Sequence, residues 1–236
     1  MKSPAAEALR KIAEADCARP FVVAQLGQSL DGRIATESGE SHYINGPAGL
    51  DHLHRLRASV DAVVVGAGTI VADDPRLSVR RCVGQNPARV VIDPKGRLGG
   101  GKRWLAEDGA RRIVVVEEGC AGVLDCERIA LPAAGGAIDP RRIVDALYGL
   151  GFPRILIEGG ARTVSSFLDA GAVDRLHLIV ACLIIGSGRP GLALPPLARL
   201  ADAARPRTDV YRLDDHDLLF DCDLRASRTQ HDSMRS

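Results

Sequence analysis

The chain has 236 residues, of which 46% are hydrophobic and 26% charged, and its 31 Lys and Arg residues almost balance its 30 Asp and Glu residues. This composition excludes a disordered chain, and the net charge of +1 excludes nucleic-acid binding through bulk positive charge. No run of eighteen apolar residues exists, so we expect no membrane-spanning segment. Residues 1–20 contain three acidic residues and no cleavable apolar segment, so we expect a cytoplasmic protein.

Short apolar runs and glycine turns predict an α/β fold. A first helix is expected over residues 4–15, where apolar residues recur at helical spacing until Arg19-Pro20. The β-branched runs that follow alternate with helical stretches, which is typical of a largely parallel sheet with helices on both faces. The predicted strands are FVVAQL, DAVVVG, ARVVID, RRIVVVE, ERIAL, RILIEGG and RLHLIVACLII. Within the last of them, Leu178 to Ile185 is expected to be a buried strand.

Proline and glycine mark the starts of three further helices. Asn45-Gly46-Pro47 and Asp139-Pro140 each precede apolar residues at helical spacing, and a third helix is expected from Gly159-Gly160. The end of the chain differs, because VYRLDD and DLLFDCDL are joined by a short turn, which predicts antiparallel strands at the sheet edge. We therefore predict an N-terminal helical extension over 1–19, one domain over 20–224 and a disordered tail over 225–236.

Several common motifs are incomplete. Residues 96–102 have the spacing of a phosphate-binding P-loop, but Arg103 stands where that motif needs a hydroxyl for magnesium. The turn at residues 66–71 lacks the third glycine of the dinucleotide-binding GxGxxG motif. His52 and His54 point to different faces of a helix, so we expect two solvent-facing side chains and no shared metal ion.

Four polar segments follow predicted strands, where parallel sheets commonly bind ligands. Glycines in them allow a ligand to approach the backbone closely, and the amides that begin the helix at Gly159 suit an anion. Together these features are typical of a nucleotide-binding pocket. The segments are SLDGRIATESGESHYI, GAGTIVADDPRLSVR, DPKGR and EGGARTVSS.

Individual residues in and near these segments allow functional and structural interpretations. Asp73-Asp74-Pro75 is either a functional acid pair or an ordinary helix end with a turn. Glu158 ends an apolar strand, so its carboxylate needs a partner, which is either a ligand amine or another protein group. Arg57 and Arg80 offer the paired donors that suit a phosphate, or are surface charges.

A longer set of motifs carries a family resemblance. SLDGRIA, SGESHYI, the LRA of residues 56–58, DAVVVGAGTIVADDPRLSVR, ARVVID and IEGGARTVSSFL occur in this order over about residues 20–224. Together they resemble the reductase domain of bacterial riboflavin biosynthesis. The resemblance implies a three-layer α/β fold similar to dihydrofolate reductase, with a mostly parallel sheet and antiparallel C-terminal strands. It also implies that NADPH reduces 5-amino-6-(5-phosphoribosylamino)uracil to the ribitylamino compound, without a metal ion.

The same resemblance implies the site residues. Ser41, Arg57 and Arg80 would hold the substrate phosphate. Glu158 would pair with the pyrimidine, and Asp73 would steer a proton. Asp31 would form part of the wall. The expected substrate contacts are Ser41, Arg57, Leu77, Arg80 and Glu158. The expected NADPH contacts are Gly27, Tyr43, Thr69, Asp73, Pro94, Gly160, Ala161, Arg162, Thr163, Val164, Ser165 and Ser166.

Two residues depart from the family pattern, which often has lysine where this chain has Gln25 and tryptophan where it has Tyr43. The lost positive charge bears on substrate choice, whereas tyrosine keeps an aromatic face for the cofactor. Many bacterial relatives also carry a zinc deaminase domain ahead of the reductase, so another protein is expected to perform deamination here. Relatives pair as dimers, and a homodimer that binds neither nucleic acid nor membrane is therefore expected.

Two alternatives stay open. A reductase of the same fold acting on another small carbonyl or imine is favoured by Gln25. A noncatalytic nucleotide-binding module would bind the same ligands without turnover. The choice of NADPH over NADH rests on the resemblance, although Lys95, Arg97 and Arg162 lie near the expected cofactor segments and suit a 2′-phosphate.

Overall fold

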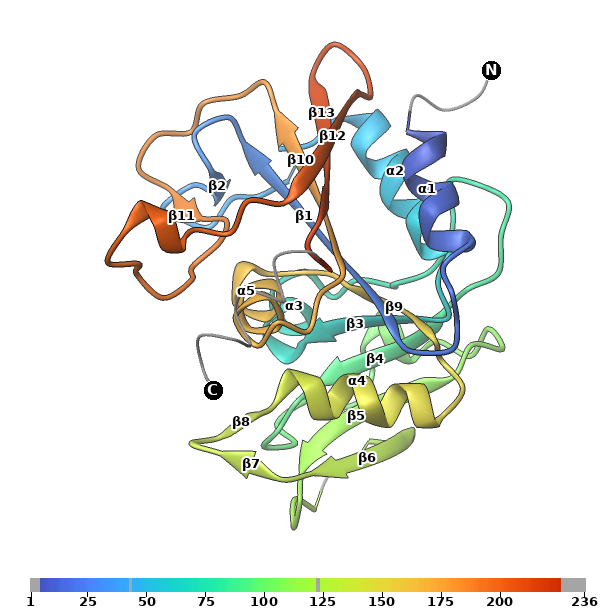
Figure 1. The fold of residues 1–236 in the computed structure, drawn as a ribbon. Coiled ribbons are helices and arrows are strands. Elements are labelled where there is room, and N and C mark those ends of the chain that lie inside the picture. The colour runs from blue at the N-terminus through green and yellow to red at the C-terminus, as the bar shows by residue number, and fades with distance from the viewer. Residues whose placement is uncertain (1–4, 43, 122–123, 226–236) are drawn as a thin grey trace.

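A computed structural model describes residues 5–42, 44–121 and 124–225. A nine-stranded sheet forms the centre, in the order β12-β13-β10-β1-β9-β3-β4-β5-β6 (Figure 1). The last two strands of the chain are antiparallel and lie at one edge, as predicted: β12 (Arg207–Arg212) and β13 (Asp217–Asp223). The parallel strands are β1 (Phe21–Ser29), β3 (Ala62–Gly66), β4 (Ala88–Ile92), β5 (Arg112–Glu117), β6 (Glu127–Leu131), β9 (Arg154–Ile157) and β10 (Arg175–Ala181).

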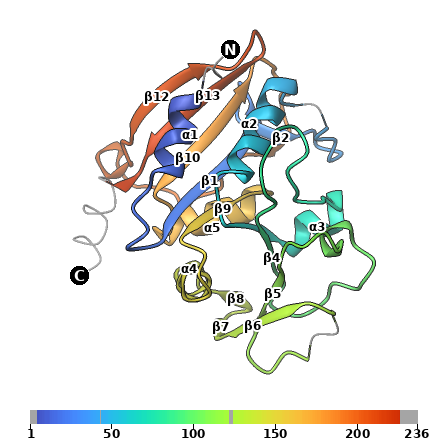
Figure 2. The same ribbon diagram turned by 90° about the vertical axis from the view of Figure 1, so that its right-hand side faces the viewer.

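Helices cover both faces of the sheet, which gives the predicted three layers (Figure 2). One face is covered by α1 (Ala6–Ala13), α2 (Pro47–Arg57), α3 (Ala67–Asp73) and the short 3-10 helix η1 (Arg103–Leu105). The other face is covered by α4 (Pro140–Gly149) and α5 (Ala161–Asp169). Two short antiparallel pairs lie outside the sheet, and the sequence did not predict them: β2 (Arg33–Ala35) with β11 (Arg189–Pro190), and β7 (Ala133–Ala134) with β8 (Ala137–Ile138). A second 3-10 helix, η2 (Leu200–Asp202), also lies outside the sheet.

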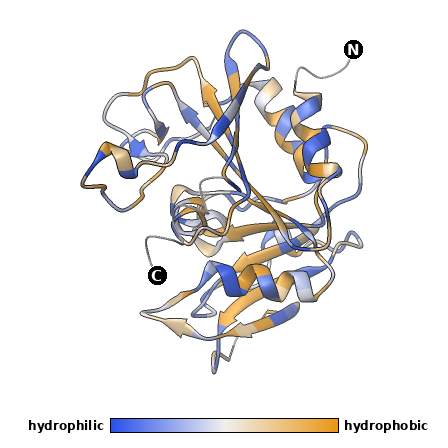
Figure 3. Cartoon of the chain, in the orientation of Figure 1, coloured by the Kyte–Doolittle hydropathy of each residue, from blue (hydrophilic) through white to orange (hydrophobic). Residues whose placement is uncertain are grey.

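Alternation along the strands builds two separate cores. In β1, Phe21 and Val23 face the helices α1 to α3, whereas Val22 and Ala24 face α4 and α5. In Figure 3 the central strands are accordingly mostly hydrophobic, while the helices mix hydrophobic and hydrophilic residues. Because both faces of the strands are buried, the sequence shows continuous apolar runs and no strict alternation.

The end of β10 differs from the prediction. The buried strand expected up to Ile185 is wrong beyond Ala181, because β1 ends at Ser29, opposite Ala181, and Leu183 and Ile184 are exposed. The predicted tail falls on residues 226–236, which lie outside the described residues. Within the described ranges, no helix has the length and apolarity needed to cross a membrane.

The prediction that His52 and His54 face solvent is wrong, because both side chains are buried under α2. His52 Nε2 lies 3.0 Å from Nδ1 of His177 in β10, and His177 Nε2 lies 3.3 Å from the buried carboxylate of Asp221 in β13. A neutral His52 that donates to His177 satisfies this arrangement. Burial, with His177 alongside, lowers the pKa of His52 to about 3.

Acidification from pH 7 to pH 5 is therefore expected to destabilise the protein. Unfolded histidine binds a proton below its ordinary pKa of 6.5, whereas His52 does so only below about 3, so the unfolded state gains the proton first. His52 alone accounts for a loss of about 2 kcal/mol in the free energy of unfolding over this range. Urea denaturation at both pH values measures the loss. His52→Phe should reduce it and His216→Phe, at an exposed position, should not; equal losses in wild type and His52→Phe would contradict this account.

Candidate active site

The strand register brings the polar segments together at one edge of the sheet. Strand β9 lies between β1 and β3, and its last residue, Ile157, is level with Ala24 and Val64. The next residue, Glu158, still bonds to the sheet, since its amide donates to the Val64 carbonyl at 2.9 Å. Because the carboxyl ends of parallel strands meet at the same edge, the residues after β1, β3, β4 and β9 converge there.

A buried ion pair joins α2 to the end of β9. The Arg57 guanidinium forms two parallel hydrogen bonds with the Glu158 carboxylate, Nε to Oε2 at 2.9 Å and Nη2 to Oε1. Its Nη1 donates to the Ser78 carbonyl at 3.1 Å, which leaves two of its five N–H groups without a partner among the described residues. Both side chains are almost fully buried. The two residues expected at opposite ends of the substrate are thus direct partners before any ligand binds.

The end of α3 and the segment after it carry three more of the predicted residues. Leu77 is fully buried, whereas Asp73 and Arg80 are exposed. The Arg80 amide donates to Nδ1 of His54 at 3.0 Å, and its guanidinium donates to the Ser78 hydroxyl at 2.9 Å. Burial and nearby arginines lower the pKa of His54 to about 4, so its ring stays neutral and able to accept this bond.

The turns after β3 and β9 contact each other. Thr69 accepts from the Gly160 amide at 3.1 Å, and a Cβ at Gly159 would lie 2.7 Å from the Thr69 hydroxyl oxygen. Gly159 also has φ +108°, a conformation that side chains rarely adopt. Among the side chains that the structure describes, none caps the N-terminus of α5, so its first amides suit an anionic ligand.

The remaining cofactor predictions differ in what the structure places there. Val164 packs in the core, and Ser165 Oγ accepts from the Ala193 amide at 2.9 Å, so both side chains hold α5 in place. Ala161 and Thr163 are half-buried in the first turn of α5, and Arg162 and Ser166 are exposed. Pro94 follows β4, and its carbonyl accepts from the Glu117 amide at 2.9 Å.

Asp217 in β13 organises the other side of the site, and sequence reasoning missed it. This fully buried carboxylate accepts from the amides of Gly46 at 2.8 Å and Gly49 at 3.2 Å at the start of α2, and from the Asn45 side chain at 3.0 Å. A Cβ at Gly27 would lie 1.8 Å from Asn45 Oδ1, so a side chain at residue 27 would require the Asn45 side chain to move. No local signal marks Asp217, because its partners are about 170 residues away in the chain.

Three predicted residues follow β1 in the chain. Ser41 is exposed, and Tyr43 lies outside the described residues. Asp31 accepts hydrogen bonds from the Ser29 hydroxyl and from the amides of Ile185 and Gly186, which lower its pKa to about 2. The Asp31 carboxylate therefore anchors the segment after β10, and a wall role remains a prediction.

Solved structures resemble this fold. The deaminase and 5-amino-6-(5-phosphoribosylamino)uracil reductase of Thermotoga maritima superposes with a TM-score of 0.72 and 32% identity, covering 87% of this chain and 56% of that one. A dihydrofolate reductase of Enterococcus faecalis has a TM-score of 0.52 at 12% identity, covering 86% and 96% of the two chains. The sheet order and these likenesses define a protein of the dihydrofolate-reductase-like fold, as predicted.

Sequence comparison gives the family. Residues 20–203 match the model of the RibD C-terminal domain. The 2,5-diamino-6-ribosylamino-4(3H)-pyrimidinone 5′-phosphate reductase of Methanothermobacter thermautotrophicus is 36% identical over 197 residues, covering 79% of this chain and 90% of that protein. The riboflavin biosynthesis protein RibD of Aquifex aeolicus is 32% identical over 173 residues, covering 72% of this chain and 48% of that protein. The chain belongs to the RibD C-terminal domain family, and spans about half the length of that bacterial RibD protein.

Proposed function

We propose that this chain is an oxidoreductase that reduces a 6-ribosylaminopyrimidine 5′-phosphate with NADPH, a step of riboflavin biosynthesis. The observation that carries the proposal is the buried Arg57–Glu158 pair at the meeting point of the segments expected to hold cofactor and substrate. The Glu158 carboxylate oxygens can accept hydrogen bonds from ring N–H groups, and two Arg57 N–H groups have no partner among the described residues. The exposed Arg80 guanidinium beside this pair suits a phosphate dianion.

The residues at the opposite side suit a dinucleotide. The uncapped N-terminus of α5 and the close contact of Gly159 and Gly160 with Thr69 leave backbone amides near the surface for a pyrophosphate. Lys95 and Arg97 in the turn after β4, and Arg162 in α5, are exposed cations that suit a 2′-phosphate. These cations support NADPH over NADH. The dissociation constants of the two cofactors, measured on the same protein preparation, test this preference.

The proposed reduction depends mainly on how the protein positions the substrate and the cofactor. Ring opening of the ribosylamine leaves an imine, to which reduction adds a hydride at the former anomeric carbon and a proton at nitrogen. NADPH, when bound, supplies the hydride. Glu158 orients the pyrimidine. Arg57, Arg80 and Ser41 fix the phosphate, and the geometry so imposed provides most of the acceleration. The exposed carboxylate of Asp73 at the end of α3 is the group that steers the proton.

Substitution of Asp73 tests this proton role. Asp73→Asn keeps the size of the side chain but removes its acid-base capacity, so turnover should fall by about a hundredfold. The exposed position predicts an unchanged melting temperature. Steady-state kinetics with saturating NADPH gives the turnover number. A variant that folds normally and turns over at the wild-type rate removes Asp73 from the mechanism.

The substrate has two candidates, which differ at pyrimidine C2. The family resemblance predicts the 2-oxo compound, 5-amino-6-(5-phosphoribosylamino)uracil. The Methanothermobacter relative is named for the 2-amino compound, 2,5-diamino-6-ribosylamino-4(3H)-pyrimidinone 5′-phosphate, and this chain covers 90% of the length of that relative. Gln25, next to Glu158 in the strand register, carries both a donor and an acceptor and fits either ring.

NADPH oxidation followed by its absorbance with each pyrimidine separates the proposals. Oxidation that depends on one of the two pyrimidine phosphates supports the proposed function and identifies the substrate. Oxidation only with another carbonyl or imine favours a different reductase of the same fold. Binding of NADPH with no turnover on any acceptor favours a noncatalytic nucleotide-binding module.

A homodimer is also proposed, and exposed apolar side chains after β10 support it. Leu183, Ile184, Leu194, Leu197 and Leu200 are all at least 42% exposed. Exposed apolar side chains, where they gather on one surface, commonly mark protein interfaces. Light scattering should give a mass of two chains for the wild type and of one chain for Ile184→Asp. A monomeric wild type, or a variant that stays dimeric, contradicts the assignment of this surface.

A further inference from the structure

The turn after α3 has an unusual backbone. Asp74 and Leu77 both have positive φ, +40° and +56°, which side-chain-bearing residues seldom adopt. A left-handed backbone is strained for residues with a side chain, so the turn needs outside contacts to persist. This turn connects Asp73, expected at the cofactor, with Leu77 and Arg80, expected at the substrate.

Arg103 supplies those contacts from a segment to which no role has been assigned. Its amide donates to Asp74 Oδ1 at 2.9 Å, its Nε donates to the Asp74 carbonyl at 2.6 Å, and its Nη2 donates to the Asp73 carbonyl at 3.1 Å. The last two bonds satisfy carbonyls at the C-terminal end of α3, where cations are also favoured by the helix dipole. The Arg103 side chain thus hydrogen-bonds to both Asp73 and Asp74, the residues at the start of the turn.

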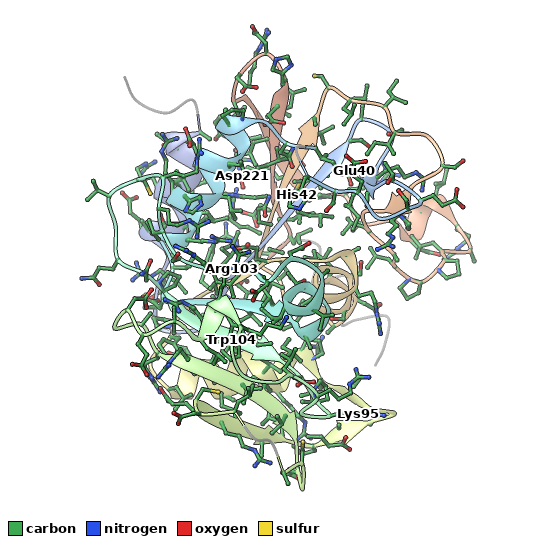
Figure 4. The ribbon with its side chains drawn as sticks, turned by 180° about the vertical axis from the view of Figure 1, so that it is seen from behind. Glu40, His42, Lys95, Arg103, Trp104 and Asp221 are labelled. Atoms are coloured by element: carbon green, nitrogen blue, oxygen red, sulfur yellow. The ribbon has the colours of Figure 1, made fainter. Side chains whose placement is uncertain are left out.

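The base of Arg103 is fixed. The next residue, Trp104, lies beside it in the chain and is fully buried in the same core as α3 (Figure 4). The Trp104 carbonyl accepts from the buried Arg89 guanidinium at 2.8 Å. Arg89 also bonds to the Ala106 carbonyl at 3.0 Å and pairs with Asp108. The segment is therefore a rigid support, and Arg103 reaches from it to the turn.

The far end of the turn is pinned by the active-site helix. Arg57 donates to the Ser78 carbonyl, and His54 accepts from the Arg80 amide. The turn is thus held between Arg103 on one side and α2 on the other, so movement at Asp74 is transmitted to Leu77 and Arg80. Burial and the guanidinium groups of Arg57, Arg76 and Arg103 lower the pKa of Arg80, and the Glu158 carboxylate opposes this shift.

We infer that Arg103 is a positioning residue that clamps the Asp73–Leu77 turn and thereby couples the cofactor site to the substrate phosphate site. The inference rests on the proposed function for the identity of the ligands. It predicts that loss of the clamp weakens both ligands together, although Arg103 is expected to touch neither. The amide of residue 103 keeps its bond to Asp74 in any variant, so the loss is partial.

The test compares Arg103→Ala and Arg103→Lys with Arg10→Ala, a matched control. Arg10 is 57% exposed against 54% for Arg103, and it too forms side-chain ion pairs, but on α1. Arg103→Ala should raise the KM of NADPH and of the pyrimidine phosphate by about fivefold to tenfold each, with a smaller change in kcat. Arg103→Lys keeps the charge but not the paired donors, so it should recover less than half of the loss. Arg10→Ala should leave both KM values unchanged.

Four results would overturn the inference: both KM values within twofold of wild type, a change in only one of them, a lower melting temperature with unchanged KM values, or full recovery by lysine. Hydrogen exchange of the ligand-free protein separates this test from that of the proposed function. Amides 74–80 should exchange faster in Arg103→Ala than in wild type or Arg10→Ala. If the wild type shows no reductase activity, the proposed function fails, and equal exchange rates in all three proteins would independently remove the clamp.

Discussion

Replacement of Glu158 by glutamine is expected to lower kcat/KM by about a hundredfold and to destabilise the fold by about 3 kcal/mol. Glutamine preserves the shape of the side chain but removes the charge that balances Arg57. The Arg57 side chain is only 5% exposed, and a buried charge that loses its partner typically costs about 3 to 5 kcal/mol. The hundredfold loss corresponds to about 2.7 kcal/mol of transition-state binding, from a misplaced pyrimidine and an unpaired guanidinium.

Urea denaturation and steady-state kinetics measure the two effects, and Glu127→Gln provides the control. Glu127 forms the same bidentate contact with Arg111, but on the surface, where such pairs contribute about 1 kcal/mol or less. A double-mutant cycle of Arg57→Ala with Glu158→Gln should show strong non-additivity, because each single change orphans the other group. If Glu158→Gln is as stable as Glu127→Gln and keeps kcat/KM within twofold of wild type, the buried pair is neither structural nor functional.

Replacement of Asp217 by alanine is expected to destabilise the protein by about 2 to 4 kcal/mol and to lower kcat/KM by about tenfold. The change leaves the amides of Gly46 and Gly49 and the side chain of Asn45 without their acceptor. It also removes a carboxylate from the N-terminus of α2, where negative charge is favourable. Because α2 carries Arg57 at its other end, a displaced helix also misplaces the Glu158 pair.

Asp209→Ala is the matched control for Asp217. Asp209 lies in β12 of the same hairpin, but it is 46% exposed and pairs with Lys11. Its loss should cost less than about 1 kcal/mol and leave the kinetics unchanged. Equal stability of Asp217→Ala and Asp209→Ala would show that the contact with α2 does not hold the helix.

Much of the architecture follows from local sequence patterns. The apolar runs became strands because burial on both faces of a parallel sheet needs continuous β-branched residues, as in β3, where Val63, Val64 and Val65 are all fully buried. Asp139-Pro140 began a helix because the aspartate side chain accepts from the Arg141 amide and proline fits the first turn. The missing helix between the last two runs correctly predicted the antiparallel pair β12–β13.

The contacts that assemble the site do not follow from local patterns. Arg57 and Glu158 are 101 residues apart, and Asp217 lies 171 residues from Gly46. The helical pattern of α2 did not predict that His52 contacts His177 in β10, because the spacing of apolar residues in a helix does not show which polar side chains lie buried beneath that helix. Leu183 and Ile184 looked like buried strand residues because hydropathy records apolar character, whereas their exposure depends on where the neighbouring strand β1 ends.

A crystal structure with NADP and ribose 5-phosphate bound tests the central claim most directly. The claim predicts that the nicotinamide ring and the sugar lie together beside the Arg57–Glu158 pair, with the phosphate on Arg80 and the pyrophosphate at the start of α5. Ligands bound at separate edges of the sheet, or a phosphate distant from Arg80, would contradict it.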